Sequence, residues 1–433
     1  MINNIHRKRE KNLGLIELIA IALGGMIGGG IFTVLGISVS MIGVFTPVAF
    51  LIGGLLAFLA VYSYIKLAVY YKDEGATYSF FKRTFPNSSF LASLIGWWVI
   101  FGYISTLALY AYTFSSYAIS GFEFANNEMI RKAIAGLIIL IFTLVNIWSV
   151  KGMGKLEDIM VYTKLVILTI ISFVLINNAN TTIPTLIQNN GDTNILSILI
   201  VASLTFVAFE GFQLVINAVN EMEKPEVNIP KSIYIALTLA MLIYFMLSYG
   251  AIIAIPFDNI IANQEYALAS GANKILGHWG TDLVVLGALL ATSSAISGTL
   301  FGASRQISVI ANDGYFPHIL TKRKNNIPIY AIIMMSVFAF TLILVGNLKV
   351  ILEFSSVTFL LVSLLMAIAN FKIYKKTNSS LFMIILAIIG LFIGMVLILY
   401  YEYTTQIEQL YFIGTLYLVL TLGAFGYSKT NKT

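Results

Sequence analysis

The sequence predicts an all-α membrane protein with about twelve transmembrane helices, of which the first and the sixth are broken. Hydrophobic residues make up 58% of the 433 positions and charged residues only 11%, whereas an average soluble domain has about 25% charged residues. Apolar runs long enough to cross a hydrocarbon core about 30 Å thick recur along the whole chain. Two of these runs are interrupted by glycine at corresponding places in the two halves of the chain.

The apolar runs define the expected helices in order. The first six fall near 13–37, 45–70, 90–120, 131–150, 156–177 and 195–220. The last six fall near 229–255, 280–310, 328–346, 350–372, 381–401 and 410–427. A transmembrane helix needs about 20 residues, so we interpret the whole chain, 1–433, as a single membrane domain.

The basic residues are distributed unevenly between the two sides of this topology. Of the 26 lysines and arginines, one side holds only Arg131, Lys132, Lys274 and Lys349. The other side, which includes the N-terminal segment 1–11, holds all the rest except Lys164. Lysine and arginine concentrate in cytoplasmic loops, which predicts a multi-pass protein of the cell membrane with both termini in the cytoplasm. The net charge of +6 therefore reflects orientation and gives no indication of nucleic-acid binding.

Two composition features exclude further classes. There is no cysteine, which excludes disulfides, thiolate metal sites and cysteine nucleophiles. The first apolar run is too long for a signal peptide and lacks a small-residue cleavage site, so we expect the N-terminus to be retained.

The order of the helices predicts an internal repeat. Five helices occupy 13–177 and the next five occupy 195–374. Because five is an odd number, the second set enters the membrane from the opposite side, which gives two inverted repeats. Two additional helices follow at 381–427. Matching interruptions in two inverted halves are typical of a transporter whose binding site lies near the bilayer midplane.

The first interruption is the run from Gly24 to Gly30, which contains five glycines in seven positions. Glycine costs about 1 kcal/mol relative to alanine in a helix interior, so the helix is expected to stop and restart here. Unwound backbone inside a membrane is tolerated only where it faces protein or a water-filled cavity. The alternative is close helix packing, because Gly24 and Gly28 also form a GxxxG face.

The two interruptions together supply groups that suit an α-amino acid. The N–H groups that begin the second half of the first helix carry partial positive charge, and Gly28, Gly29 and Gly30 leave that backbone accessible to a carboxylate. The carbonyls near 23–26 and 206–209 carry partial negative charge and suit an ammonium group. The remaining expected substrate-binding residues line the same breaks: Met26, Ile27, Val207, Phe209, Glu210 and Phe212.

Four motifs resemble the amino acid–polyamine–organocation (APC) superfamily, and in particular its ApcT-like amino acid permeases. The motifs are GGMIGGGIF at 24–32, DEGATYSFFKRTFP at 73–86, FEGFQ at 209–213 followed by NEMEKPEVNIPKSI at 220–233, and RQISVIANDGYFP at 305–317. The resemblance covers about 13–377. It implies a LeuT-type fold of five plus five helices, an alternating-access cycle and an amino acid as the substrate.

Lys164 is expected near the bilayer centre, about nine residues or roughly 14 Å along the helix from Lys155. A lysine at that depth costs about 2.5–3.5 kcal/mol on insertion scales, so we expect a function in proton exchange rather than snorkelling to the surface. In ApcT-like permeases, the lysine at this position resembles a built-in cation that occupies the place of the sodium ion in sodium-coupled relatives. The resemblance implies the following partners: the carbonyl of Gly24 and hydroxyls among Thr292, Ser293 and Ser294. Those hydroxyls could instead bond within their own helix.

Glu210 is an acid at a position that is usually neutral in the family that the chain resembles. An intramembrane carboxylate is a candidate functional residue. Three roles stay open at this point: it pairs with a cationic substrate side chain, relays protons with Lys164, or remains protonated.

These observations predict a secondary active amino acid transporter, proton-coupled, with an amino acid, protons and membrane lipids as partners. The alternatives are an amino acid or amine exchanger in which Lys164 is a fixed structural cation, and an amino acid sensor that does not transport. An enzyme is not expected, since the chain has no Walker loop, no His-Glu-x-x-His, no nucleophile elbow and only three histidines. No cofactor or metal is expected, and the oligomeric state and side-chain preference stay undetermined.

Overall fold

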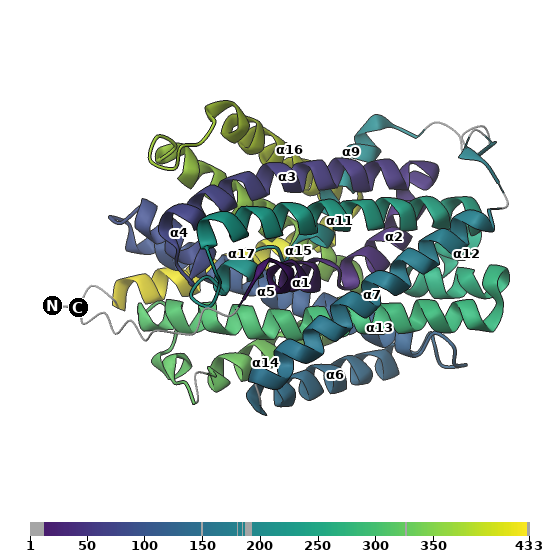
Figure 1. The fold of residues 1–433 in the computed structure, drawn as a ribbon, viewed down its shortest axis with the longest axis horizontal. Coiled ribbons are helices and arrows are strands. Elements are labelled where there is room, and N and C mark those ends of the chain that lie inside the picture. Colours follow the sequence, from purple (N-terminus) through teal and green to yellow (C-terminus); the bar gives the residue numbers. More distant parts are fainter. Residues whose placement is uncertain are drawn as a thin grey trace.

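The computed structural model describes residues 13–148, 150–179, 181–183, 185–186, 193–324 and 327–430. The side chains of 150–157, 265, 273–276 and 430 are not described either. The basic segment 1–11 and Lys432 therefore lie outside the described residues, and so do the side chains of Lys151, Lys155 and Lys274. The helices run along the length of an elongated bundle (Figure 1).

The first half of the chain contains α1 (Leu15–Met26), α2 (Gly29–Ile42), α3 (Thr46–Tyr71), α4 (Ala76–Thr84), α5 (Ser89–Ala118), α6 (Glu128–Trp148) and α7 (Val150–Asn177). The second half contains α9 (Ile195–Thr205), η2 (Phe206–Phe209), α10 (Leu214–Asn217), α11 (Pro225–Ala254), α12 (Phe257–Ala262), η3 (Gln264–Tyr266) and α13 (Ala267–Asn312). It continues with η4 (His318–Thr321), α14 (Ile329–Val345), α15 (Leu348–Lys372), α16 (Leu381–Thr405) and α17 (Ile407–Thr430).

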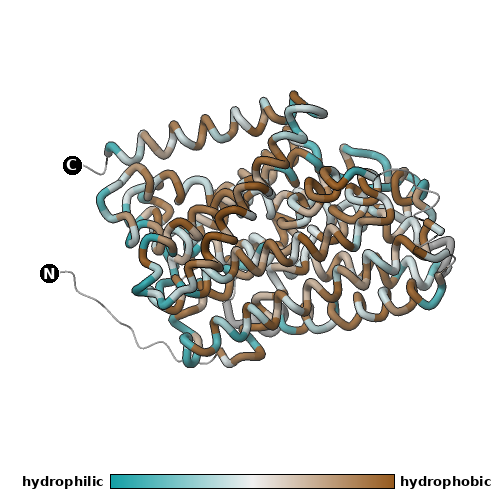
Figure 2. Tube along the Cα trace, turned by 90° about the horizontal axis from the view of Figure 1, so that it is seen from above, coloured by the Kyte–Doolittle hydropathy of each residue, from teal (hydrophilic) through white to brown (hydrophobic). Residues whose placement is uncertain are grey.

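The prediction of an all-α membrane protein is confirmed. Within the described residues, ten helical stretches are long and apolar enough to cross a membrane, and α1 and α14 are shorter apolar helices. Every predicted range contains one of these helices or, for the first and sixth, two helical pieces separated by a break. Hydrophilic residues gather at the two ends of the bundle (Figure 2), as expected for helices whose middle sections lie in hydrocarbon.

Two features differ from the predicted ranges, and a third concerns how deeply the last helices are buried. The short helices α4 and α12 lie in connections that contain no apolar run of membrane length, so periodicity gave no indication of them. The helix predicted from 280 begins earlier, because α13 continues from Ala267 through a non-helical residue, Gly277. The helices α16 and α17 bury much less of their apolar surface than α15, so the two added helices lie at the periphery.

The segments predicted to be cytoplasmic meet at one end of the bundle. Lys72, just after α3, forms an ion pair with Glu226 at the start of α11 (3.2 Å), and Lys82 on α4 pairs with Asp313 after α13 (2.8 Å). Tyr78 donates a hydrogen bond to Asp313 (2.8 Å). Burial and the Asp313 carboxylate raise the pKa of Tyr78 well above its ordinary value, so its hydroxyl stays protonated and available as a donor.

Both ends of the described chain lie near these segments. Leu13 donates a backbone hydrogen bond to Glu221 (3.1 Å) and accepts one from Glu223 (3.0 Å), directly before α11. At the other terminus, Ser93 on α5 donates to the carbonyl of Ala424 on α17 (2.8 Å). The start of α1 and the end of α17 are therefore at the same end of the bundle.

The segments predicted to face the other side meet at the opposite end. Tyr266 in η3 hydrogen-bonds Asn126 in the connection before α6 (3.1 Å), and Lys132 on α6 donates to the carbonyl of Leu344 near the end of α14 (3.3 Å). The chain is thus a multi-pass membrane protein whose loops form two sets. The compartment that each set faces stays a prediction.

Candidate substrate site at the two helix breaks

The first break is shorter than the glycine run that predicts it. Gly24 and Gly25 are still helical, because α1 ends at Met26, and only Ile27 (φ −84°, ψ 79°) and Gly28 (φ −119°, ψ −140°) leave the helical region before α2 begins. The first N–H groups of α2 have no intrahelical acceptor, as at any helix start. They therefore provide hydrogen-bond donors in the middle of the bundle.

The second break lies at the predicted position between η2 and α10. Glu210 is extended (φ −70°, ψ 154°) and Gly211 has a positive φ of 112°. That conformation is strained for any residue with a Cβ. The Gly211 N–H donates to the side-chain oxygen of Gln213 (3.1 Å), which satisfies one of the backbone groups that the break leaves without a helical partner.

The two breaks are in direct contact. A Cβ on Gly211 would lie 2.3 Å from the carbonyl carbon of Gly25, and a Cβ on Gly30 would lie 2.7 Å from Cα of Ala208. Only residues without side chains allow the backbones to approach this closely. Gly25, Gly30 and Gly211 therefore allow close packing between the breaks, and Gly211 also permits the non-helical turn at the second break.

The glycines that were predicted to expose backbone to a carboxylate are closely covered by protein atoms. A Cβ on Gly28 would lie 2.6 Å from the Cβ of Ala295 on α13, and a Cβ on Gly29 would lie 2.8 Å from Oγ1 of Thr113 on α5. Thr113 is held there by a 2.6 Å hydrogen bond with Thr33 on α2. In this structure the side-chain side of Gly28 and Gly29 is filled, so a ligand would reach α2 only from the side of its N–H groups.

The carbonyls at the end of α1 and in the break are occupied by donors from two neighbouring helices. Lys164 on α7 donates to Gly24 (3.2 Å) and Ile27 (2.6 Å), and Tyr110 on α5 donates to Gly25 (3.3 Å). A carbonyl oxygen has two lone pairs, so an ammonium group can still share these acceptors. The contact from Tyr110 is the longest of the three and therefore the weakest by geometry.

Tyr244 on α11 connects the two breaks through its hydroxyl group. The oxygen lies 2.8 Å from the carbonyl of Met26 in the first break and 2.8 Å from that of Ala208 in the second. Its ring packs against Phe209, which was predicted as a wall of the site, with a centroid separation of 5.1 Å. Because the hydroxyl has one proton, it donates to one of the two carbonyls at a time.

Lys164 is completely buried, and three acceptors contact its ammonium group within the described chain. The third is Oγ of Ser294 on α13 (2.6 Å), which itself donates to the carbonyl of Ala291 in its own helix (3.0 Å). Thr292, another hydroxyl that the resemblance implies, donates to the carbonyl of Ala288 (2.7 Å). Ser293 is also buried on α13, and no contact of its hydroxyl contributes to this arrangement among the described residues.

Glu210 is 1% exposed and has one carboxylate oxygen in use. Its Oε2 accepts a hydrogen bond from Gln213, whereas Oε1 has no hydrogen-bond partner among the described residues. Burying an acceptor without a donor costs about 1–3 kcal/mol, so Oε1 is the most conspicuous unsatisfied group at the breaks.

The other predicted wall residues are buried around the same breaks. Val207 is 1% exposed, and its carbonyl accepts the N–H of Glu210 (3.2 Å). Phe212 packs edge to face against Tyr64 on α3, with ring centroids 5.1 Å apart. The structure therefore brings the predicted residues of the two breaks together inside the bundle. It also adds Tyr110 and Tyr244, which no sequence pattern distinguishes among the 23 tyrosines.

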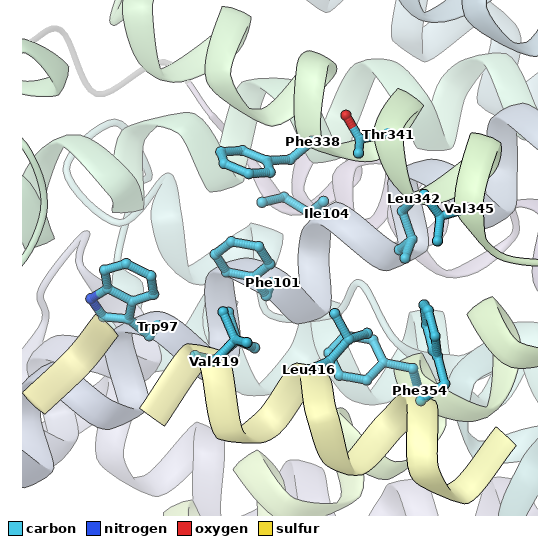
Figure 3. Close-up of a pocket in the computed structure, with 12 residues that line it drawn as sticks. Trp97, Phe101, Ile104, Phe338, Thr341, Leu342, Val345, Phe354, Leu416 and Val419 are labelled. Carbon is cyan, nitrogen blue, oxygen red and sulfur yellow. The ribbon is translucent and has the colours of Figure 1, made fainter. Parts of the chain in front are cut away.

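A separate cavity of about 390 Å³ lies between α5, α14, α15 and α17 (Figure 3). Its walls are apolar, with Phe101, Phe338 and Phe354 among the aromatic side chains and Thr341 among the few polar ones. None of its lining residues belongs to the breaks, so this cavity is distinct from the candidate substrate site.

Comparison with known proteins identifies the family. The sequence model of the amino acid permease family matches residues 13–422. The inner membrane transport protein YbaT of Escherichia coli is 28% identical over 441 residues, covering 100% of both chains. The chain is also similar to the chloroplastic cationic amino acid transporter 7 of Arabidopsis thaliana, with 24% identity over 85% of this chain and 66% of the relative. It is similar to the branched-chain amino acid permease BcaP of Bacillus subtilis, with 25% identity over 72% of this chain and 70% of the relative. The chain therefore belongs to the amino acid permease family of the APC superfamily and is a membrane transporter rather than an enzyme.

Proposed function

We propose that this chain is a secondary active transporter that takes up amino acids together with protons by alternating access. The observation that carries the proposal is the position of Lys164. This buried ammonium group connects the last turn of α1 and the break residue Ile27 to α13 through Gly24, Ile27 and Ser294.

The proton of Lys164 affects the packing of the broken helix directly. A charged lysine has three N–H donors, and three acceptors surround it here. Loss of one proton leaves two donors and removes the charge, so at least one charge-assisted hydrogen bond worth about 1.5–3 kcal/mol is lost. Deprotonation would therefore loosen α1 from α7 and α13, which is the kind of change that an alternating-access cycle requires.

The available proton energy is sufficient for uptake. A pH difference of one unit is worth about 1.4 kcal/mol per proton, and a membrane potential of 100 mV adds about 2.3 kcal/mol per charge. Together these supply about 3.7 kcal/mol, which corresponds to roughly a 500-fold accumulation of a neutral substrate.

The breaks supply complementary groups for an amino acid with a positively charged side chain. The N–H groups at the start of α2, which have no intrahelical acceptor, are donors for its carboxylate, and carbonyls at the breaks are acceptors for its α-ammonium group. Oε1 of Glu210, which is buried and unpartnered within the described chain, is an acceptor for the second positive charge. We therefore infer that Glu210 selects cationic amino acids, the first of its three predicted roles.

The proposal includes the arrangement of the chain. Residues 13–177 and 195–374 would form the two inverted repeats, and 381–427 the two added helices, within a LeuT-type fold. The two breaks in contact at Gly25 and Gly211 support this arrangement. The gathering of basic loop segments at one end supports a cytoplasmic location for both termini in the cell membrane.

Uptake of radiolabelled arginine into proteoliposomes tests the function. Wild-type protein is expected to concentrate arginine when the outside is acidic and to be indifferent to sodium. Lys164→Ala should lose this accumulation, while Lys164→Arg, which keeps the charge but does not release its proton, should bind substrate without gradient-driven accumulation. Lys132→Ala, which changes a lysine at the end of the bundle, is the control and should behave as wild type.

Each other result contradicts a defined part of the proposal. Uptake that needs sodium, or an unchanged pH dependence in Lys164→Ala, would exclude Lys164 as the coupling residue. Uptake that occurs only when the vesicles contain amino acid would indicate an exchanger. Binding without any uptake would indicate a sensor.

A further inference from the structure

A second polar pocket lies far from the breaks, at the end of the bundle where the basic segments meet. It has a volume of about 550 Å³ and is formed by the last turns of α3, the first turns of α11 and the segment 376–378 after α15. Three lysines line it: Lys66, Lys72 and Lys376. We refer to this site as the basic pocket.

The basic pocket has more positive than negative charge. Lys72 forms an ion pair with Glu226 (3.2 Å), the acidic residue that lines the pocket. Lys66 donates to the backbone carbonyl of Asn378 (2.7 Å), and within the described chain neither Lys66 nor Lys376 forms an ion pair with a carboxylate. Two ammonium groups that have no carboxylate partner within the described chain therefore face one pocket, and this charge favours an anionic ligand.

The third wall of the basic pocket is fixed in place. The backbone N–H of Ser380 donates to the hydroxyl of Tyr62 on α3 (2.6 Å), and Thr377 donates to the side chain of Asn370 on α15 (2.8 Å). Together with the bond from Lys66, these contacts hold the segment after α15 against α3. The lysines are thus presented by a preformed site rather than by a loose loop.

Several of the other lining residues of the basic pocket are apolar. Ile65, Val69 and Tyr234 line it, and Tyr234 stacks on Phe58 with a centroid separation of 6.1 Å. A ligand with an anionic head and apolar chains would match both parts of this surface.

The depth of the basic pocket agrees with a lipid headgroup. A helix of 26 residues such as α3 is about 39 Å long, longer than the hydrocarbon core of about 30 Å. Lys66 lies five residues, or about 8 Å, before the end of α3, close to the place where a centred helix of this length would leave the hydrocarbon. A lysine near a helix end extends its ammonium group toward the polar interface, so we expect the ammonium groups at the level of the phosphates and the apolar wall beside the acyl chains.

We infer that the basic pocket binds an anionic phospholipid, with the phosphate between Lys66 and Lys376 and the acyl chains along α3 and α11. Such a lipid would join three elements, α3, α11 and the segment after α15, at one end of the bundle. Basic pockets between transmembrane helices are typical sites for anionic headgroups. This inference does not depend on proton coupling or on the identity of the transported amino acid.

Binding of phosphatidylglycerol and phosphatidylcholine with identical chains to the purified full-length protein tests the inference. Wild-type protein is expected to bind phosphatidylglycerol about thirtyfold more tightly, since each lysine near an anionic lipid contributes roughly fivefold. The double variant Lys66→Gln/Lys376→Gln should lose most of this preference. Lys322→Gln/Lys324→Gln, which changes two exposed lysines in the connection before α14, is the matched control and should keep it.

A measurement on the unmodified protein covers the possibility that the double variant fails to fold. Phosphatidylglycerol should slow acetylation of Lys66 and Lys376, but not of Lys322, when the labelled sites are identified by mass spectrometry. Equal binding of both lipids, an unchanged preference in the folded double variant, or uniform acetylation would overturn the inference. Equal protection by millimolar inorganic phosphate would also overturn it, because the ligand would then be a free anion rather than a lipid.

Discussion

Replacing Tyr244 with phenylalanine removes a single oxygen atom from the place where the two breaks meet. The ring is retained, and its packing on Phe50 and Phe209, with centroids 5.9 and 5.1 Å away, needs no change. The carbonyl of Met26 keeps a second partner, the N–H of Gly28 (3.0 Å). The carbonyl of Ala208 has no other hydrogen bond among the described residues, so the substitution leaves it buried and unsatisfied.

The expected loss of stability follows from the hydrogen bonds that these two carbonyls retain. One buried acceptor without a donor is worth about 1–3 kcal/mol, so Tyr244→Phe should lower the free energy of unfolding by about that amount. The loss should also reduce the rate of uptake, since the hydroxyl is the direct link between the breaks. Unfolding by sodium dodecyl sulfate in mixed micelles measures the first effect, and uptake into proteoliposomes measures the second.

Tyr103→Phe is the matched control for this experiment. Tyr103 is also a buried tyrosine in a transmembrane helix, but within the described chain its hydroxyl has no hydrogen-bond partner. Its removal should leave the free energy of unfolding unchanged or slightly increased. If Tyr244→Phe is as stable as wild type, or if both variants lose the same amount, the hydroxyl of Tyr244 does not hold the breaks together.

Two further predictions concern the second break. Glu210→Gln should weaken binding of lysine and arginine about tenfold or more relative to alanine, because a charge-assisted hydrogen bond of about 1.5–3 kcal/mol is lost. Competition binding measures the three affinities. An equal loss of affinity for all three amino acids would instead favour a proton or structural role for Glu210. Gly211→Ala should prevent the breaks from packing, since its Cβ would lie 2.3 Å from Gly25 at a φ of 112°, at a cost of at least 1–3 kcal/mol. Gly426 has open space around it, so Gly426→Ala is the control and should fold like wild type. If thermal unfolding shows normal stability for both variants, the contact between Gly25 and Gly211 is disproved.

The helices and both breaks were predictable because their signals are local. Apolar runs of membrane length give the spans directly, and a glycine run or an acid followed by glycine within such a run is visible without any neighbour. The exact extent of the first break was not predictable. Gly24 and Gly25 remain helical because packing against the second break and the bond to Lys164 stabilise them, and these contacts come from residues about 140–190 positions away.

The partners of individual side chains were harder to predict for the same reason. Tyr244 and Met26 are 218 positions apart, and their hydrogen bond exists only because α11 lies beside both breaks. A tyrosine in an apolar run carries no mark of such a role. Lys164 was recognisable because a lysine at mid-membrane depth is costly unless it is paired. The sequence could not show which hydroxyl of Thr292, Ser293 and Ser294 it contacts, because that depends on how α13 is turned toward α7.

The crowding of the glycines limits how this transporter can change its substrate. Because even a methyl group on Gly28, Gly29 or Gly30 would overlap a neighbouring helix, these positions cannot be varied to enlarge or reshape the site. Within the proposed substrate site, a new specificity would therefore have to come from side chains at the second break such as Glu210 and Phe212. The proposed site would then divide into a constant first break, which contacts the groups common to all amino acids, and a second break whose side chains can change.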